Sequence, residues 1–342
     1  MKPVVRNRKF MIARFAGLTT LLFVMIFIGS PQLGSTDAAL APVLGIVSTG
    51  RIPLVGVSGL GWAEAVGQEA TIVAVSDREP VFTRSRIRGE KFEVVASVDF
   101  REALLERFSV CGHAATPGCQ KMAEWINGQW EAVATDGANR VFLLHEKAQS
   151  VIVLDKMGKN VIGHWELDFA KLGLPQSGMQ ENKMGEGLVL LANGHILVAK
   201  EAGPALVIEF AQQGDAAGSS ILPLAAGAEF PGAEGHKRMV PVRRWLLDRE
   251  FDRCDLSDLA MSSRGELFIL SQTCRMVGKV MSGAGRTLVL SQVWKIPEVV
   301  KHPEGLVLLK DGSFGVSDDS NNRMRQNFFM LRSIAAPSVA VH

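Results

Sequence analysis

Three features of the 342-residue sequence predict an all-β fold, namely a β-propeller of five or six four-stranded blades. Short apolar segments rich in β-branched residues and Leu alternate with turns containing Gly, Asn or Asp, which is typical of strands joined by hairpins. A unit of this kind recurs along the chain, as a radial arrangement of similar blades requires. The apolar positions show no 3.6-residue period, so a helical repeat is disfavoured.

The first element is the N-terminal segment, residues 1–38, which we interpret as a signal peptide or a membrane anchor. Basic residues precede an apolar run at 15–28, and small or polar residues follow it, in the order of a secretory signal. This run is shorter than the roughly 20 residues that span a bilayer, although counting from Phe10 allows an uncleaved anchor. In either case we expect the predicted propeller domain, residues 39–342, to be exported, either periplasmic or anchored to the outer face of the inner membrane.

The charge of the predicted domain excludes one class of partner. Residues 1–38 contain five of the 37 basic residues and one of the 35 acidic residues, so the remainder has a net charge of about −2. Binding a nucleic acid backbone requires a concentrated positive face. We therefore expect no nucleic acid as partner, which leaves a small anionic ligand or a protein.

The repeat itself is clearest at residues 130–155, 185–210, 256–280 and 303–331. In each copy an acidic or small polar residue begins an apolar strand, a turn follows, and a second apolar strand ends in a polar residue. These two polar residues are 15 apart in every copy: Glu131 and Glu146, Glu186 and Glu201, Ser257 and Gln272, Glu304 and Asp319. A looser copy begins near residue 58, with Asp77 in the place of Glu201.

The remaining strands complete the blades. Outer strands are predicted at 92–100, 160–169 and 287–296, and a helix is predicted at 100–108. Residues 43–57 could supply an outer strand to the last blade and close the ring, which would remove open sheet edges. Five blades are recognisable, and a sixth would have to lie in a diverged stretch, since no repeat is visible at 211–250.

The four cysteines predict disulfides. Their number is even, the chain is predicted to be exported, and none forms a CxxC pair. Three connectivities are open, of which local pairing is the simplest: Cys111 with Cys119 and Cys254 with Cys274. A redox or zinc site is the alternative, but the spacings fit no zinc template.

Several repeat segments carry a family resemblance. EGLVLLANGHILVAKE, the copy with DLSDLA and LFILSQ, and the copy with PEGLVLL and VSDDSNN resemble the SdiA-regulated family of exported β-propellers and the related phytase-type, esterase-like propellers. The resemblance covers about residues 55–332. It implies acidic residues around a central channel, calcium binding in some members, and esterase or phosphoesterase activity. The sequence departs from the pattern at Ser257 and Gln272, so the acidic ring is incomplete.

The acidic residues of the repeat are the candidate site. The first strand of each blade lines the channel of a propeller, so the metal-ligand candidates Glu131, Glu186 and Glu304, with Asp258 or its neighbour Asp255 from the fourth copy, are expected to converge near the axis. Such an oxygen-rich cluster is the ligand set that Ca²⁺ prefers. Asp319, a further ligand candidate, should lie on the same rim, as should the candidate catalytic residues Glu146 and Glu201. The alternative is that these carboxylates cap strand starts or are solvated loop charges.

Two functions follow from these candidates. The first is an extracytoplasmic propeller that binds a cation, calcium, near its channel and a ligand or partner on its rim loops. The second is a calcium-dependent hydrolase of a phosphate ester, carboxyl ester or lactone, in which the cation polarises an oxygen and activates water. Lys183, Lys200, Arg140 and Arg323 would then bind an anionic substrate. Binding is preferred because the acidic set is incomplete and no GxSxG, HExxH or Walker motif is present.

Overall fold

The computed structural model describes residues 41–66, 69–108, 125–174, 183–216, 221–248, 251, 253–281, 285–319, 322 and 324–333. The chain divides into two units, Met1–Ser35 and Thr36–His342, and every described residue belongs to the second. The predicted signal or anchor segment, the Cys111–Cys119 pair and Arg323 lie outside the described residues. Within the described ranges, no helix has the length and apolar character needed to cross a membrane.

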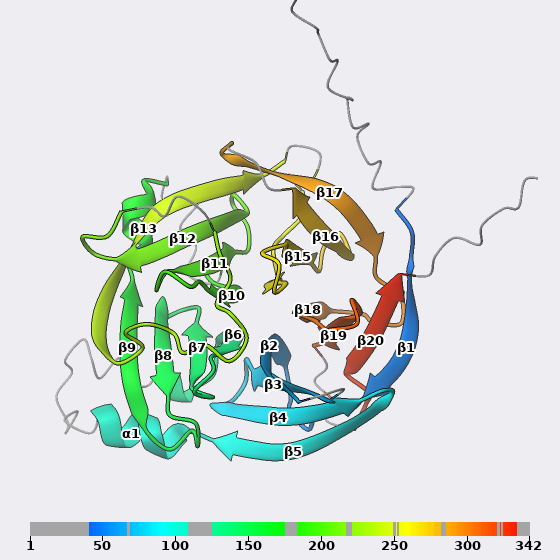
Figure 1. Cartoon of the computed structure of the whole chain (residues 1–342), viewed down its shortest axis with the longest axis horizontal. Helices are drawn as coiled ribbons and strands as arrows, with labels where there is room; N and C mark the ends of the chain where they lie inside the picture. The colour runs from blue at the N-terminus through cyan, green and yellow to red at the C-terminus, as the bar shows by residue number, and fades with distance from the viewer. Residues whose placement is uncertain are drawn as a thin grey trace, which may run out of the picture. The chain divides into compact units, whose positions relative to one another are not determined.

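The described residues form five four-stranded blades around a central axis (Figure 1). Blade 1 contains β2 (Val57–Val66), β3 (Glu69–Ser76), β4 (Val81–Arg88) and β5 (Lys91–Asp99). Blade 2 contains β6 (Trp130–Thr135), β7 (Val141–His145), β8 (Ser150–Leu154) and β9 (Val161–Leu167). Blade 3 contains β10 (Gly187–Leu190), β11 (Ile196–Lys200), β12 (Leu206–Gln212) and β13 (Gly235–Leu247). Blade 4 contains β14 (Asp258–Met261), β15 (Leu267–Ser271), β16 (Met276–Met281) and β17 (Thr287–Lys295).

Blade 5 is built from both ends of the domain. It contains β18 (Pro303–Leu308), β19 (Phe314–Asp318) and β20 (Phe328–Ser333), with β1 (Leu44–Gly50) as its outer strand. The pairing of β1 with β20 is antiparallel and runs from Leu44 opposite Ser333 to Gly50 opposite Phe328. The predicted fold class and the predicted ring closure are therefore confirmed, and the described strands make five blades rather than six.

The stretch 211–250, in which no repeat is visible, supplies the outer strand of blade 3 instead of a sixth blade. With 13 residues, β13 extends beyond its antiparallel partner β12. Its first residues pair in parallel with β9 of blade 2, and its last two pair in parallel with β17 of blade 4. This strand therefore joins three neighbouring blades along the outside of the ring.

Helical structure is confined to short segments of the described chain. The predicted helix is present as α1 (Arg101–Phe108), which follows β5 and buries Ala103 and Leu104. These two side chains belong to a core cluster that also contains Trp125 and Trp130. A 3₁₀ segment, η2 (Phe169–Leu172), follows β9. The helix thus covers the outer side of the junction between blades 1 and 2.

The hydrophobic core is divided among the junctions between neighbouring blades. One cluster combines side chains of blades 1 and 2, and others combine blades 2 and 3, blades 3 and 4, blades 4 and 5, and blades 5 and 1. Burial of apolar surface contributes roughly 25 cal/mol per Å² of surface removed from water. Because each junction buries such a cluster, the ring is stabilised along its whole circumference.

Close packing of the innermost strands explains a glycine of the repeat. A Cβ atom on Gly187 of β10 would lie 2.6 Å from the backbone nitrogen of Leu259 in β14. A Cβ on Gly305 of β18 would lie 2.9 Å from the backbone nitrogen of Leu60 in β2. Only glycine lets adjacent inner strands approach this closely. Each of these glycines directly follows a glutamate of the repeat, Glu186 or Glu304.

Candidate metal centre

Strand pairing brings the two polar positions of each repeat to the same end of the blade. In blade 2, Trp130 pairs with His145, so the following residues Glu131 and Glu146 lie at one end of the β6–β7 hairpin. Blades 3 and 5 repeat this arrangement, with Gly187 opposite Ala199 and Pro303 opposite Asp318. Among the carboxylates at this end of the ring, we call the following seven the acidic rim: Asp77, Glu131, Glu146, Glu186, Glu201, Glu304 and Asp319.

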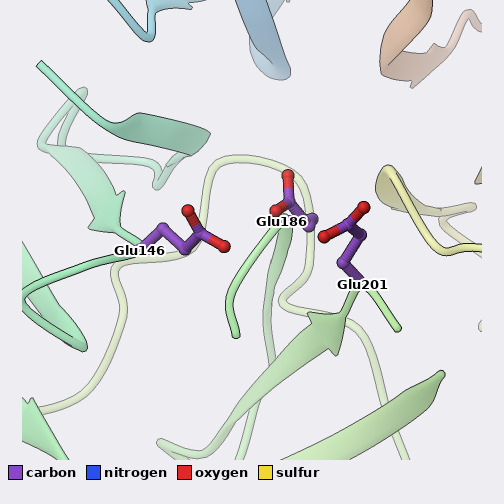
Figure 2. A group of neighbouring side chains, drawn as sticks. All are labelled: Glu146, Glu186 and Glu201. Atoms are coloured by element: carbon purple, nitrogen blue, oxygen red, sulfur yellow. The ribbon is translucent and has the colours of Figure 1, made fainter. Parts of the chain in front are cut away.

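Three of these carboxylates are close enough to share one cation. Glu146 follows β7, Glu186 precedes β10 and Glu201 follows β11, and Figure 2 shows their carboxylates turned toward one another. One oxygen from each lies within 4.8 Å of the others. Calcium binds oxygens at about 2.3–2.6 Å, so a single ion spans up to about 5 Å between opposite ligands. The three glutamates can therefore hold a metal ion.

Burial and mutual repulsion oppose the ionisation of this trio. Burial raises the pKa of Glu146 to about 7, although hydrogen bonds from the Met184 N–H and with Glu186 lower it. Burial also raises the pKa of Glu186 well above its usual range, and the charges of Glu131, Glu146 and Glu201 add to this rise. The pKa of Glu201 is raised by burial as well. A hydrogen bond between two carboxyl groups requires a shared proton, which a cation could replace.

The other members of the acidic rim surround the trio. Burial raises the pKa of Glu131 far above its ordinary value, and the charges of Glu146, Asp77, Glu304 and Asp319 raise it further. Glu131 is only 7% exposed. Burial raises the pKa of Glu304 to about 8 and that of Asp77 to about 6. The charge of Glu131 therefore interacts with that of Glu146 of the trio and with those of Asp77, Glu304 and Asp319.

Asp258 does not join these carboxylates, contrary to our expectation. Its side chain is 1% exposed and accepts backbone hydrogen bonds from Leu259 at 2.7 Å and from Leu306 at 2.6 Å. Burial raises its pKa well above the usual range, and the backbone hydrogen bonds lower it. Asp258 stands one residue after Ser257, in the place of Gly187, and therefore faces the neighbouring inner strand. It links β14 to β18 instead of facing the trio.

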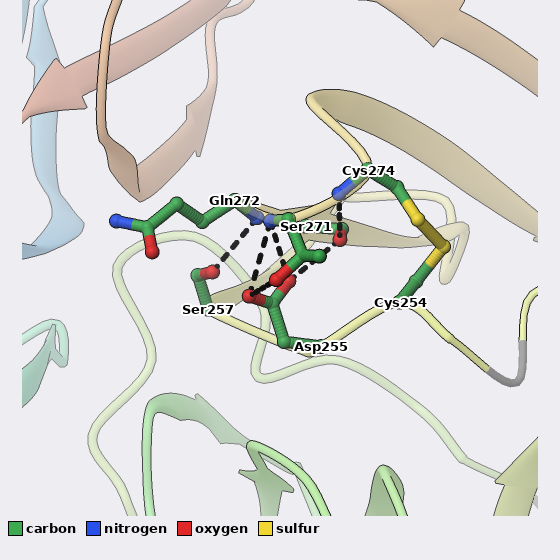
Figure 3. The surroundings of a disulfide bond; sticks show 7 residues. Cys254, Asp255, Ser257, Ser271, Gln272 and Cys274 are labelled. Carbon is green, nitrogen blue, oxygen red and sulfur yellow. Dashed lines mark hydrogen bonds between the residues drawn. A yellow bond between two sulfur atoms is a disulfide. The ribbon is translucent and has the colours of Figure 1, made fainter.

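Blade 4 carries neutral residues where the other blades carry acids. Gln272 replaces the second carboxylate, and its amide donates a hydrogen bond to Glu304 at 2.7 Å. A disulfide joins Cys254 to Cys274, which confirms that local pairing (Figure 3). Asp255 accepts hydrogen bonds from the Ser271 hydroxyl and the Thr273 N–H. Sequence reasoning missed the contact between Gln272 and Glu304, although the 15-residue spacing placed both on one rim.

The four predicted anion-binding cations have different positions. Lys183 lowers the pKa of Glu146 and Glu201 and therefore lies beside the trio. Lys200 is buried, and its ammonium donates hydrogen bonds to the carbonyls of Ala202 and Pro204. Arg140 lies in the β6–β7 turn at the opposite end of blade 2, where it pairs with Asp136. Arg140 was thus wrongly expected at this rim, and Lys200 stabilises the loop that follows Glu201.

Comparisons with solved structures find proteins of low identity. Glutaminyl cyclase from Myxococcus xanthus is 11% identical, with a TM-score of 0.48, over 85% of this chain and 96% of that chain. Virginiamycin B lyase from Staphylococcus aureus is 12% identical, with a TM-score of 0.37, over 86% of this chain and 75% of that chain. PQQ-bound aldose sugar dehydrogenase from Streptomyces coelicolor is 11% identical, with a TM-score of 0.41, over 85% of this chain and 97% of that chain. Likenesses this weak carry no argument about activity.

Comparison with protein families is more informative. No curated protein sequence matches this chain. The family model described as SdiA-regulated matches residues 121–325, which is more than half of the chain and includes blades 2 to 4 and the inner strands of blade 5. This is the family that the repeat segments around Glu186, Ser257 and Glu304 resemble. The chain therefore belongs to the SdiA-regulated family.

Proposed function

We propose that this protein is an exported β-propeller that binds Ca²⁺ at the acidic rim and a ligand or partner on the loops around it. The observation that carries the proposal is the trio of Glu146, Glu186 and Glu201, whose oxygens lie within 4.8 Å of one another. All the donors are carboxylate oxygens, which suit hard cations such as Ca²⁺, Mg²⁺ and Mn²⁺. Export is supported by the Cys254–Cys274 disulfide, since disulfides persist in oxidising compartments.

The ligand would bind beside the cation. The turn after Glu146 leads into a cavity of about 390 Å³, lined by Lys147, Gln149, Glu166, Asp168 and Arg238, among others. Arg238 pairs with Asp168 at 2.8 Å, so charges of both signs line the cavity. Its size is within the range of small-molecule sites. A small polar ligand that carries an anionic group would find both cationic side chains and hydrogen-bond acceptors there.

The test is calorimetric titration of Ca²⁺ into the purified, chelator-treated protein. We expect one saturable site in the wild type, a large loss of affinity in Glu186→Gln, and no change in Glu93→Gln. Glu93 lies exposed on β5, outside the acidic rim, and serves as the matched control. Wild-type protein that binds no Ca²⁺, or a Glu186→Gln variant with unchanged affinity, would refute the proposal.

A metal-dependent hydrolase is the second candidate. The observation that favours it is that carboxylates outside the trio of Glu146, Glu186 and Glu201 also interact with one another: the charges of Glu304 and Asp319, like that of Glu146, raise the pKa of Glu131. Two cations about 4 Å apart could clamp the attacking and leaving oxygens of an ester. Glu146 and Glu201 would then orient the water. Two bound Ca²⁺ per chain and calcium-dependent turnover of a phosphate ester, carboxyl ester or lactone would support this reading, and one ion without turnover would exclude it.

A further inference from the structure

Gln272 is one of two positions, with Ser257, at which blade 4 carries a neutral residue in place of an acid of the repeat. The corresponding residue after the second strand is Asp77, Glu146, Glu201 or Asp319 in the other four blades. Asp258 pairs with Leu270, so Gln272 stands at the same end of its hairpin as those acids stand in theirs. The amide is therefore in an acid's place and not at an unrelated surface position.

The turn that carries Gln272 is fixed from several sides, as Figure 3 shows. The disulfide joins Cys274 to Cys254 in the segment that leads into β14. The Gln272 N–H donates to the Ser257 hydroxyl at 3.0 Å, and the Thr273 N–H donates to Asp255 at 3.1 Å. These contacts hold the backbone on both sides of Gln272. Its side chain consequently extends from a rigid base.

The amide of Gln272 reaches across to the neighbouring blade. Its Nε2 donates to Oε1 of Glu304 at 2.7 Å, and this hydrogen bond lowers the pKa of Glu304 against the larger effect of burial. A carboxylate in the same place would bring two oxygens together at this distance. That arrangement requires a proton or an additional positive charge between them. The neutral amide therefore orients Glu304 without adding to the negative charge.

We propose that Gln272 is a specificity-determining residue of the acidic rim, which positions Glu304 and limits the negative charge, and thereby limits the preference of the site for a trivalent over a divalent cation. This inference rests on the proposed cation binding. The Coulomb energy of an added carboxylate scales with the charge of the ion, so a trivalent ion gains more from it than a divalent ion does. Affinity in oxygen-ligand sites is tuned by the number of charged ligands.

The experiment compares Ca²⁺ and Tb³⁺ binding by calorimetry in the full chain, for the wild type, Gln272→Glu and Gln272→Met. We expect Gln272→Glu to raise the ratio of Tb³⁺ to Ca²⁺ affinity by about tenfold or more. Gln272→Met removes the donor to Glu304 without adding charge, so both affinities should fall about tenfold with the ratio unchanged. Matched controls are Gln292→Glu and Gln292→Met on the exposed face of β17, which should leave both affinities unchanged.

The outcomes separate this inference from the proposed function. Wild-type protein that binds neither ion overturns the proposed function, and the role of Gln272 falls with it. If the wild type binds Ca²⁺ and both Gln272 variants have the wild-type affinities and the wild-type ratio of Tb³⁺ to Ca²⁺ affinity, the role of Gln272 is overturned and the proposed function is not. An equal change of the ratio in the Gln292 variants also overturns it, because the effect would then come from general surface charge.

Discussion

Without a cation at the acidic rim, the stability of this protein should fall as the pH rises. Burial raises the pKa of Glu146 from an ordinary 4.5 to about 7 in the folded protein. A carboxyl whose pKa is raised on folding stabilises the folded state fully below the unfolded pKa, and this contribution is lost as the pH rises through the folded pKa. The window for Glu146 is therefore from about pH 4.5 to about pH 7. Glu304, whose pKa is raised to about 8, extends the window upward.

The magnitude follows from the pKa difference. One pKa unit corresponds to about 1.4 kcal/mol, so the difference of about 2.5 for Glu146 gives roughly 3 kcal/mol between the two ends of the window. Glu146 is only 4% exposed, so solvent screens this effect weakly. Native proteins have about 5–15 kcal/mol of stability in total, so the loss should be easily measured.

The assay is urea unfolding followed by Trp fluorescence, in chelator at about pH 5, 6, 7 and 8. We expect the free energy of unfolding of the wild type to decrease by roughly 3 kcal/mol or more across this series. Glu146→Gln should flatten the curve, Glu93→Gln should not, and saturating Ca²⁺ should restore stability most strongly at the highest pH. A wild-type curve that is flat or rises with pH in chelator would refute the electrostatic account of the rim.

Three further predictions test the scaffold through urea unfolding midpoints. Gly187→Ala places a Cβ 2.6 Å from the backbone nitrogen of Leu259 and should cost about 1–3 kcal/mol, whereas an unchanged midpoint would show that the inner strands can separate. Replacing Cys254 and Cys274 together by Ser should cost about 2–4 kcal/mol, and a midpoint equal to the wild type's would contradict a structural role. Asp258→Ala removes the acceptor of three backbone N–H groups and should cost about 3 kcal/mol at roughly 1 kcal/mol each, while a stabilised variant would argue against this link between blades.

The repeat spacing was sufficient to predict the blades and the end at which the carboxylates gather. A hairpin with a fixed turn length brings residues 15 apart to one blade end, as the pairing of Trp130 with His145 and of Gly187 with Ala199 confirms. The turn glycines Gly194 and Gly265 both have a φ of +82°, a backbone conformation that the hairpin needs and that other residues adopt at a cost. Local sequence therefore determined this part of the fold.

Other features depend on contacts that the sequence does not display. The strand β13 pairs with strands of two other blades, so its role follows from tertiary packing and not from any repeat. The misplacement of Asp258 was avoidable, since alignment of the copies puts it opposite Gly187, a position that faces the next inner strand. The exact partners within the acidic rim depend on side-chain rotamers, which spacing cannot predict.

The pKa values of carboxylates at the two ends of the propeller are shifted in opposite directions. At the end with the β6–β7 and β18–β19 turns, Asp136 binds Arg140. Burial is the largest single effect on Asp155 and Asp311 and raises the pKa, but the several hydrogen bonds of each carboxylate together bring its pKa below the usual value. At the acidic rim, burial is the largest cause that raises the pKa of each of the seven carboxylates, and the charge of a neighbouring carboxylate raises it further.

The same hairpins form both ends, so the fold does not impose this difference. Apolar clusters at every blade junction supply stability that the rim's repulsion reduces. Buried acids whose repulsion destabilises the folded state are typical of a binding site, because a cation that binds only the folded state restores the lost stability. The contrast between the two ends therefore supports our proposal that the acidic rim binds a cation.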